Sequence, residues 1–279
     1  MIEFKDLTFT YKDETKPALQ EIRLSVPEGG FLGVIGPAGA GKTTLARAIT
    51  GMVPHHYPGD FYGSVSVNGL DTVDTSILDI SRLVGMVFQD VDSQIISPLV
   101  EDEILYGLEN FGIPREEIPR RMEEALEKVG ISDLRGRMVT SLSGGQRQKV
   151  AIASIIALKP RILVLDEPTG ELDPRSSRQI FSLLKELNEE QGITVVVIEQ
   201  KIMLLCEFAK ELAVLSEGRI VRQGPTRDVL AHAEELQTIG VNCPRVTTLS
   251  RILSRKIGTE QPVCVNLDEA ETMVRRLIG

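Results

Sequence analysis

The segment FLGVIGPAGAGKTTLARAIT, residues 31–50, decides the fold of this chain of 279 residues. An apolar run from Phe31 to Ile35 ends at a glycine-rich turn, and a helical pattern containing Leu45 and Ile49 follows the turn. The residues of the turn are Gly36, Pro37, Ala38, Gly39, Ala40, Gly41, Lys42, Thr43 and Thr44. A strand, such a loop and a helix in this order indicate the phosphate-binding loop of an α/β protein.

The chemistry of this loop is that of a nucleoside triphosphate site. Its glycines let the backbone turn tightly, so that successive N–H groups point at the phosphates, and the helix N-terminus adds partial positive charge. Lys42 is expected to reach the β- and γ-phosphates, and the hydroxyl of Thr43 to ligate Mg²⁺. The loop alone fits kinases, GTPases and motor ATPases equally well.

A second glycine-rich element, Leu142-Ser143-Gly144-Gly145-Gln146, directly precedes a helical stretch at residues 147–158. It could simply cap that helix. A cap explains neither the glutamine that ends the element nor its spacing to a pair of acids further along the chain. We therefore interpret it as a second phosphate-binding nest, although one chain has no use for two nests on one nucleotide.

The pair of acids ends an apolar run. Ile162 to Leu165 is followed by Asp166 and Glu167. At the carboxyl end of a buried strand, Asp166 is placed to hold Mg²⁺ through water, and Glu167 to polarise the water that attacks the γ-phosphate. A purely structural role for Glu167 is the alternative.

Together these segments resemble the signature loop, the Walker B strand and the catalytic glutamate of the ABC ATPases. The resemblance is inconsistent with a P-loop kinase. It implies an α/β P-loop NTPase fold of the ABC nucleotide-binding type, with a RecA-like parallel-sheet core, an antiparallel β layer and a helical subdomain. In this family the signature loop of one subunit covers the γ-phosphate held by the P-loop of another. The resemblance therefore implies a head-to-tail pair of chains with ATP and Mg²⁺ between them.

The same resemblance assigns roles to residues elsewhere in the chain. Gln89 matches the Q-loop glutamine, which senses Mg²⁺ and the γ-phosphate. Asp173 matches the D-loop, which runs along the dimer seam. Tyr11 matches the aromatic residue that stacks on adenine, although a lone tyrosine fits an ordinary core position as well.

One position departs from the family pattern, because Gln200 stands where these ATPases usually carry a switch histidine. A neutral amide can hydrogen-bond the γ-phosphate, but it carries neither a titrating proton nor a positive charge. We hypothesise that the site on this chain's own P-loop hydrolyses ATP slowly, or that Gln200 only positions water and phosphate. The intact signature loop could still complete a competent site on a different partner subunit.

Residues 88–95, 100–103 and 106–110 are similar to the ATPases of energy-coupling-factor importers, which take up vitamins or cobalt and nickel ions. The similarity implies three kinds of partner: an identical chain or a related ATPase in a dimer, an integral membrane coupling subunit, and a separate membrane protein that selects the substrate. The coupling helices of that membrane subunit carry arginines, so Asp92 is the candidate acidic contact. A solvated acid on a polar loop is the alternative.

Periodicity divides the chain into an ATPase domain at residues 1–223, with a helical subdomain at about 90–158, and a helical extension at 224–279. Strands are predicted at residues 2–10, with a break near Asp6, at 19–26 and around Val65 and Val67. The absence of helical patterns between them predicts an antiparallel layer. The extension predicts helices near 226–239, 247–256 and 267–278, and the importer resemblance implies that it serves dimerisation.

Charge and hydropathy argue against several classes of protein. The chain has 31 Lys and Arg against 40 Asp and Glu, a net charge of −9, which argues against binding nucleic acid. No apolar run is long enough to cross a bilayer, and the first residues lack the layout of a secretory signal. We therefore expect a peripheral protein on the cytoplasmic face of the cell membrane, held there by its partner. The remaining rival is a soluble ABC ATPase that acts in protein or cofactor assembly without a membrane subunit.

Overall fold

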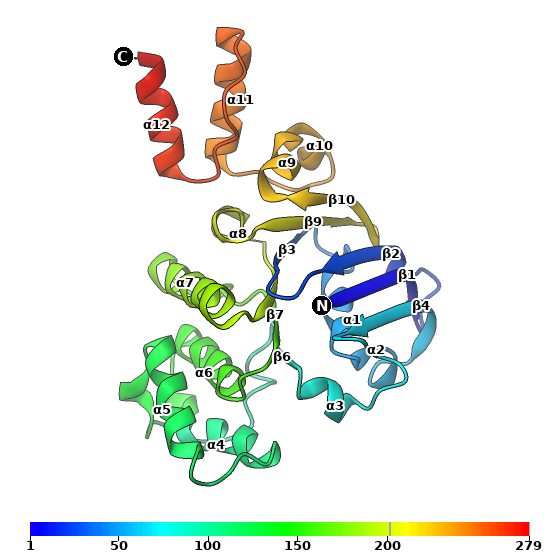
Figure 1. Cartoon of the computed structure of the whole chain (residues 1–279), viewed down its shortest axis with the longest axis vertical. Helices are drawn as coiled ribbons and strands as arrows, with labels where there is room; N and C mark the ends of the chain where they lie inside the picture. Colours follow the sequence, from blue (N-terminus) through cyan, green and yellow to red (C-terminus); the bar gives the residue numbers. More distant parts are fainter. Residues whose placement is uncertain (201, 279) are drawn as a thin grey trace.

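A computed structural model of the chain describes residues 1–200 and 202–278. Two sheets form its framework (Figure 1). One has four strands in the order β2-β1-β4-β5, and the other has six strands in the order β10-β9-β3-β8-β7-β6. The α/β architecture with a separate antiparallel layer agrees with the fold expected from the sequence.

The four-stranded sheet is antiparallel. Its strands are β1 (Ile2–Tyr11), β2 (Leu19–Val26), β4 (Gly59–Val67) and β5 (Leu70–Asp71). The break predicted near Asp6 is confirmed, since Asp6 has φ +50° and the register of β1 against β2 shifts between Phe4 and Leu7. β4 begins at Gly59, well before Val65. The sequence did not predict its first half, because that half is partly exposed and lacks the apolar alternation that predicts a strand.

The six-stranded sheet carries the parallel core. Its strands are β3 (Phe31–Ile35), β6 (Val84–Val87), β7 (Ile162–Asp166), β8 (Thr194–Ile198), β9 (Glu211–Ser216) and β10 (Arg219–Pro225). β3, β6, β7 and β8 are buried along their whole length, as is usual for parallel strands covered on both faces. The carboxyl ends of parallel strands meet at one edge, so the segments that follow these four strands become neighbours.

Helices cover both sheets and fill the connections. They are α1 (Lys42–Ile49), α2 (Met52–His55), α3 (Ile77–Ser81), α4 (Val100–Asn110), α5 (Ile118–Val129), α6 (Gly144–Ala157), α7 (Pro174–Gln191), α8 (Ile202–Phe208), α9 (Thr226–Ala231), α10 (Ala233–Thr238), α11 (Arg245–Ile257) and α12 (Leu267–Ile278), with 3-10 turns at Ser132–Leu134 and Val139–Ser141. α4, α5 and α6 lie between β6 and β7 in the chain and group together, green in Figure 1, where the helical subdomain was expected.

Two large hydrophobic clusters stabilise this arrangement. One joins side chains of both sheets to α1, including Phe9, Leu45 and Val196, and so fixes the helix that follows the glycine-rich loop. The other joins the opposite face of the six-stranded sheet to the helical subdomain and to α7, with Leu163 and Phe181 among its fully buried members. The glycine-rich loop therefore starts and ends on rigid elements.

The C-terminal region differs in detail from its prediction. The helix expected at 226–239 is two short helices, α9 and α10, which meet at His232. Their Val229, Leu230 and Leu236 belong to the large cluster around α7, and Gln223 lies inside β10. The division at Gln223 stays a prediction, and this packing favours counting α9 and α10 with the domain that precedes them.

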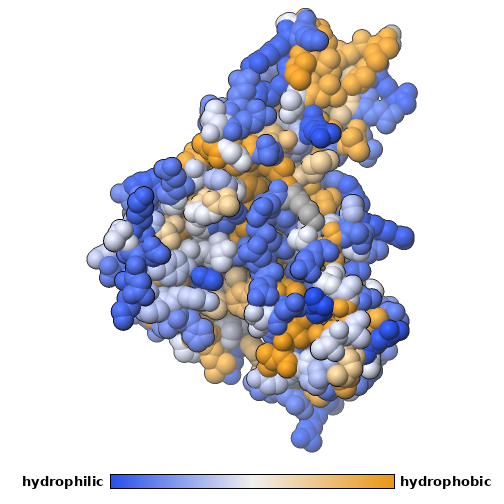
Figure 2. Space-filling view, turned by 180° about the vertical axis from the view of Figure 1, so that it is seen from behind, coloured by the Kyte–Doolittle hydropathy of each residue, from blue (hydrophilic) through white to orange (hydrophobic). Residues whose placement is uncertain are grey.

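α11 and α12 extend from the body of the molecule (Figure 1). They share a small core of their own, formed by Val246, Cys264, Ala270 and Met273. Figure 2 shows apolar side chains gathered over this protruding part. The exposed large apolar residues of the two helices are Leu249, Ile252, Ile257, Leu267, Leu277 and Ile278.

Candidate functional site

The glycine-rich loop is shaped by close backbone approaches. A Cβ atom at Gly36 would lie 2.1 Å from the carbonyl oxygen of Leu215, and one at Gly41 would lie 2.4 Å from that of Ala18. Gly41 also has φ +100°, a conformation that side chains disfavour. These two positions require glycine, because β9 and the start of β2 press against the loop as it enters α1.

Lys42, the first residue of α1, folds its side chain back over the loop. Its Nζ donates to the carbonyl oxygens of Gly36 and Pro37, each at 2.9 Å. Burial lowers the pKa of Lys42, and the nearby carboxylates of Glu167 and Asp166 partly oppose that shift. A largely buried ammonium group beside a loop of backbone amides is suited to an anionic ligand.

Thr43 and Asp166 form the second part of the site. The hydroxyl of Thr43 donates to Oδ2 of Asp166 at 2.7 Å. Burial raises the pKa of Asp166, and the hydrogen bond from Thr43 lowers it in part. A hydroxyl and a buried carboxylate side by side are the oxygen ligands that Mg²⁺ prefers, so this donor set fits the expected cation.

Glu167 is held between two glutamines. Nε2 of Gln89 donates to its Oε2 at 3.0 Å, and Nε2 of Gln200 donates to its Oε1 at 2.6 Å. The three residues expected to be catalytic therefore meet at one carboxylate, at the ends of β6, β7 and β8. Gln89 contacts Glu167 here rather than the Thr43–Asp166 pair, and its role toward Mg²⁺ stays a prediction.

Tyr11 lies at the end of β1 against the first turns of α1. Its hydroxyl is 3.0 Å from Oγ1 of Thr44 and accepts a hydrogen bond from Arg47 at 3.0 Å. Its ring packs edge-on against those of Phe9 and Tyr57. This packing is what an ordinary core tyrosine makes, and stacking on adenine stays a prediction.

Ser143 caps α6 and also explains its neighbour Gln146. The hydroxyl of Ser143 accepts from the N–H of Gln146 at 3.3 Å, and Oε1 of Gln146 accepts from the N–H of Ser143 at 2.9 Å. This is a complete capping box. The argument that a helix cap leaves the glutamine unexplained is therefore wrong, and Gln146 has a structural role within its own chain.

The signature-like element, residues 142–146, and the P-loop, residues 36–44, face different cavities. Ser143, Gly144, Gly145 and Gln146 line one of about 520 Å³, together with residues of α7 and of the loop before it. Gly36, Pro37 and Ala38 line another of about 170 Å³, together with Gln200. Neither of these two cavities is lined by residues of both predicted phosphate-binding elements.

Asp92 is neither a free nor a purely solvated acid. Its two carboxylate oxygens accept hydrogen bonds from Arg147 at 2.5 and 3.3 Å, and Arg147 also donates to the carbonyl oxygen of Leu142 at 2.8 Å. The pair ties the segment after Gln89 to the helix that the signature-like element begins. Sequence reasoning missed it, because residues so far apart in the chain carry no local signal of pairing.

Two further features were not anticipated. Glu199 is 2 % exposed and accepts hydrogen bonds from the N–H and the hydroxyl of Thr169, so it fixes the loop that follows Glu167. Residues 240–242, between α10 and α11, line the 170 Å³ cavity beside Pro37 and Ala38. The C-terminal region thus reaches the phosphate-binding loop.

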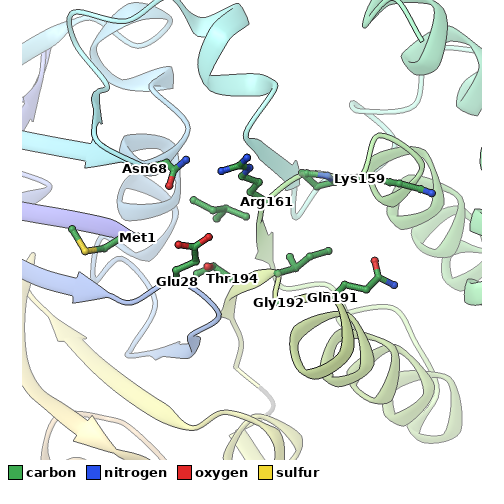
Figure 3. A pocket seen from close by; sticks show the side chains of 11 residues that line it. Met1, Glu28, Asn68, Lys159, Arg161, Gln191, Gly192 and Thr194 are labelled. Atoms are coloured by element: carbon green, nitrogen blue, oxygen red, sulfur yellow. The ribbon is translucent and has the colours of Figure 1, made fainter. Parts of the chain in front are cut away.

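A cavity of about 300 Å³ lies at the opposite edge of the six-stranded sheet, where β7 and β8 begin. Glu28 and Arg161 point into it (Figure 3), while Lys159 points away, toward Glu124, to which it donates at 3.0 Å. None of the residues predicted for the nucleotide site lines it. It therefore plays no part in the site described above.

Comparisons with known proteins identify a family and several relatives. The ABC transporter family model matches residues 19–170. A putative ABC transporter ATP-binding protein of Pyrococcus horikoshii is 39% identical over 98% of this chain and 96% of its own length. The energy-coupling factor transporter ATP-binding protein EcfA1 of Caldanaerobacter subterraneus is 40% identical over 94% of both chains. The chain spans only 40% of another relative, a longer putative ABC transporter ATP-binding protein of Methanosarcina acetivorans.

Solved structures are similar over most of the chain. The cbiO1 protein of Clostridium perfringens, described as part of the ABC transporter complex cbiONQ, gives a TM-score of 0.75 at 30% identity, over 90% of this chain and 98% of that one. The ATP-binding cassette MJ0796, in a dimeric post-hydrolysis state with ADP and Pi, gives 0.73 at 30% identity, over 81% and 99%. Over residues 1–200 and 202–278, no helix is long and apolar enough to cross a membrane.

Proposed function

This chain belongs to the ABC transporter family of ATP-binding proteins, and from that membership we propose that it binds and hydrolyses ATP with Mg²⁺ between two chains to power an energy-coupling-factor type importer. The observation that carries the two-chain site is the separation of the P-loop and the signature-like element into different cavities. The dimeric state reported for MJ0796 supports it.

The proposed chemistry divides among the side chains of one edge. Lys42 and the loop amides bind the phosphates, and Thr43 and Asp166 hold the cation. When bound, Mg²⁺ supplies charge neutralisation at the β- and γ-phosphate oxygens. Glu167, oriented by the amides of Gln89 and Gln200, accepts a hydrogen bond from the attacking water and aligns it with the γ-phosphate.

The proposed partners follow from the relatives. EcfA1 is named as an energy-coupling factor protein and cbiO1 as part of a transporter complex, which supports a membrane coupling subunit and a separate membrane protein for the substrate, a vitamin or a transition-metal ion. In this proposal the chain lies on the cytoplasmic face of the membrane. The exposed apolar side chains of α11 and α12 support dimerisation with an identical or related ATPase.

Asp92 remains a candidate contact for the membrane subunit, although it already forms an ion pair within its own chain. Its side chain is 63% exposed while it pairs with Arg147, so an arginine of a partner would share or replace an existing ion pair. Asp92→Asn should weaken co-purification with a polytopic membrane protein and leave ADP binding intact. Capture of cytosolic proteins alone would instead favour the rival function, an ATPase of protein or cofactor assembly.

The two-chain site is tested with Glu167→Gln, which should bind ATP and not hydrolyse it. With ATP and Mg²⁺ this variant should be dimeric in the ultracentrifuge, and residues 142–146 should become protected from hydrogen exchange, whereas ADP should leave them unprotected. Lys42→Ala in the same background is the control. It removes the ammonium group that is proposed to bind the phosphates, so ATP should not protect residues 142–146 in it. A strictly monomeric variant with normally bound ATP contradicts the proposal.

A further inference from the structure

A carboxylate of the same chain lies directly beside Gly144 of the signature-like element. A Cβ atom at Gly144 would lie 1.7 Å from Oε2 of Glu171, so the space beside this glycine is filled by that carboxylate. Gly145 packs in the same way against Leu172, whose Cδ2 would lie 3.0 Å from an added Cβ. The two glycines are small enough to let the loop before α7 lie directly against the start of α6.

The charges around this contact are mostly negative. The 520 Å³ cavity is lined by three acids, Asp133, Glu171 and Asp173, and by one base, Lys149. Asp173 accepts from the N–H groups of Arg175 and Ser176 at 2.9 and 3.0 Å, so it serves as the cap of α7. Lys149 donates to Oε1 of Gln179 at 3.5 Å. Glu171 is thus the acid that lies against the glycines.

The start of α6 can stabilise one anion, but two anions placed there together would repel each other. The N-terminal end of a helix carries partial positive charge, which stabilises a carboxylate placed there. A γ-phosphate brought to Ser143 and Gly145 by a second chain would meet the carboxylate of Glu171 at close range, and like charges at such a distance repel. Glu171 is exposed, so its side chain is free to rotate into solvent when the phosphate arrives.

We propose that Glu171 competes with the γ-phosphate for the signature loop and so sets the ATP concentration at which two chains close. The inference rests on the two-chain site proposed above and adds a regulator to it. In the absence of ATP the carboxylate of Glu171 occupies the loop. Closure requires its displacement, which raises the ATP concentration needed.

The test uses the full chain in the Glu167→Gln background and follows hydrogen exchange during an ATP titration. Glu171→Gln keeps the shape of the side chain and removes its charge. The ATP concentration that half-protects residues 142–146 should fall by about three- to fivefold, the size expected for one exposed charge contact. ADP binding, read from protection of residues 36–44, should not change, because ADP has no γ-phosphate to present.

Glu190→Gln, on the exposed far end of α7, is the matched control for the loss of one negative charge. Its ATP midpoint, the ATP concentration that half-protects residues 142–146, should equal that of the parent, which is the chain with Glu167→Gln alone. Added salt should lower the midpoint of the parent more than that of Glu171→Gln, because salt screens the repulsion.

The sign of the shift decides between two roles. A higher midpoint for Glu171→Gln would mean that Glu171 pairs with a cation of the other chain, and it would overturn the proposal, as would an unchanged midpoint or an equal shift in the control. Parent chains that bind ATP yet never protect residues 142–146 contradict the two-chain site, and the role of Glu171 falls with it. Protection of residues 142–146 by ATP at a midpoint that Glu171→Gln does not change would contradict this inference and leave the two-chain site standing.

Discussion

At the residue scale, Glu167 depends on two neutral amides. Gln89 and Gln200 orient its carboxylate through one hydrogen bond each. An amide neither gains nor loses a proton near neutral pH, whereas a histidine at position 200 would titrate there. The hydrogen bonds to Glu167 should therefore keep their strength across the physiological pH range.

Replacing Gln200 tests what the missing histidine costs. Gln200→His should raise the ATPase kcat by about tenfold, within the range of a positioned acid–base group, and should add a titration near pH 6.5 to the kcat profile. Gln200→Ala should lower kcat, since Glu167 loses one of its donors. Rates measured from pH 5.5 to 8.5 check both; a clear drop for Gln200→His would show that the native site is not impaired.

Asp166 illustrates a conflict between stability and function. Its folded-state pKa is raised by burial, so the protonated form favours the folded chain. Its contribution to stability is therefore most favourable at acidic pH and is lost as the pH rises through the folded pKa. Binding of Mg²⁺ needs the ionised form and should weaken as the pH falls through that same pKa.

Asp166→Asn should separate these two effects. In the absence of nucleotide the variant should melt about 2–4 °C higher at pH 7, because a buried charge is removed while Thr43 keeps an acceptor. Its affinity for ATP in the presence of Mg²⁺ should fall, with little change when Mg²⁺ is left out. Calorimetry with and without the cation measures both, and equal losses under the two conditions would argue against a role for Asp166 in holding Mg²⁺.

At the scale of elements, the segment after Gln89 is fastened at several points. The side chain of Gln94 accepts from the N–H of Phe88 at 2.9 Å and donates to the carbonyl of Met86 at 3.1 Å. Buried Glu103 accepts from the N–H groups of Ile96 and Ser97 at 3.0 and 2.9 Å. Together with the Asp92–Arg147 pair, these bonds link the end of β6 to α4 and α6. A displacement at Gln89 should therefore reach the helical subdomain.

A double-mutant cycle measures the link between Asp92 and Arg147. Asp92→Ala, Arg147→Ala and the double variant should give a coupling in the free energy of unfolding of about 0.5–1 kcal/mol, as for other partly exposed pairs. ADP binding should stay unchanged in all three, because neither residue touches the P-loop. Urea denaturation supplies the free energies, and a coupling of zero would mean that the pair does not hold the segment.

The sequence predicted those elements whose side chains are themselves periodic. The parallel strands and the loop of residues 36–44 were found because burial on both faces and the need for glycine leave a local pattern. The extent of β4, the split at His232 and the Asp92–Arg147 pair were not found. Each depends on contacts between distant segments, for which the residues involved give no local signal.

The lack of a local signal for distant contacts also explains why the interpretation of residues 142–146 from the sequence was incomplete. Their sequence pointed to a phosphate nest, and the structure adds that Ser143 and Gln146 cap α6 and that Gly144 accommodates Glu171. The capping pattern was readable in the sequence, since a serine three residues before a glutamine is its usual form. The Glu171 contact was not, because it depends on how α7 packs beside α6.

At the scale of the molecule, the packing of the first domain continues past Gln223. β10 extends to Pro225, and the side chains of α9 and α10 complete a cluster that reaches α7. α11 and α12 instead pack mainly on each other. Dimerisation and folding should therefore be separable at the start of α11 and not at Gln223.

Two truncations test this separation. A chain ending at Gln223 should be strongly destabilised, since it exposes the partners of Val229, Leu230 and Leu236, whose burial is worth about 1.5–3 kcal/mol each. A chain ending at Cys243 should melt close to the full chain and bind ADP, but should dimerise more weakly without ATP. Thermal melts and sedimentation compare the two, and equal stability would support the boundary at Gln223.

The passage of residues 240–242 beside the P-loop has a practical consequence. The next residue, Cys243, is half-buried, while the other two thiols, Cys206 and Cys264, are buried. Burial also raises the pKa of Cys243, so a maleimide dye would couple to it faster under alkaline conditions. The native chain thus carries its own attachment point for a fluorophore one residue beyond the wall of the cavity at Pro37 and Ala38. If the proposed site binds nucleotide there, the brightness of that dye should follow nucleotide arrival without any engineered cysteine.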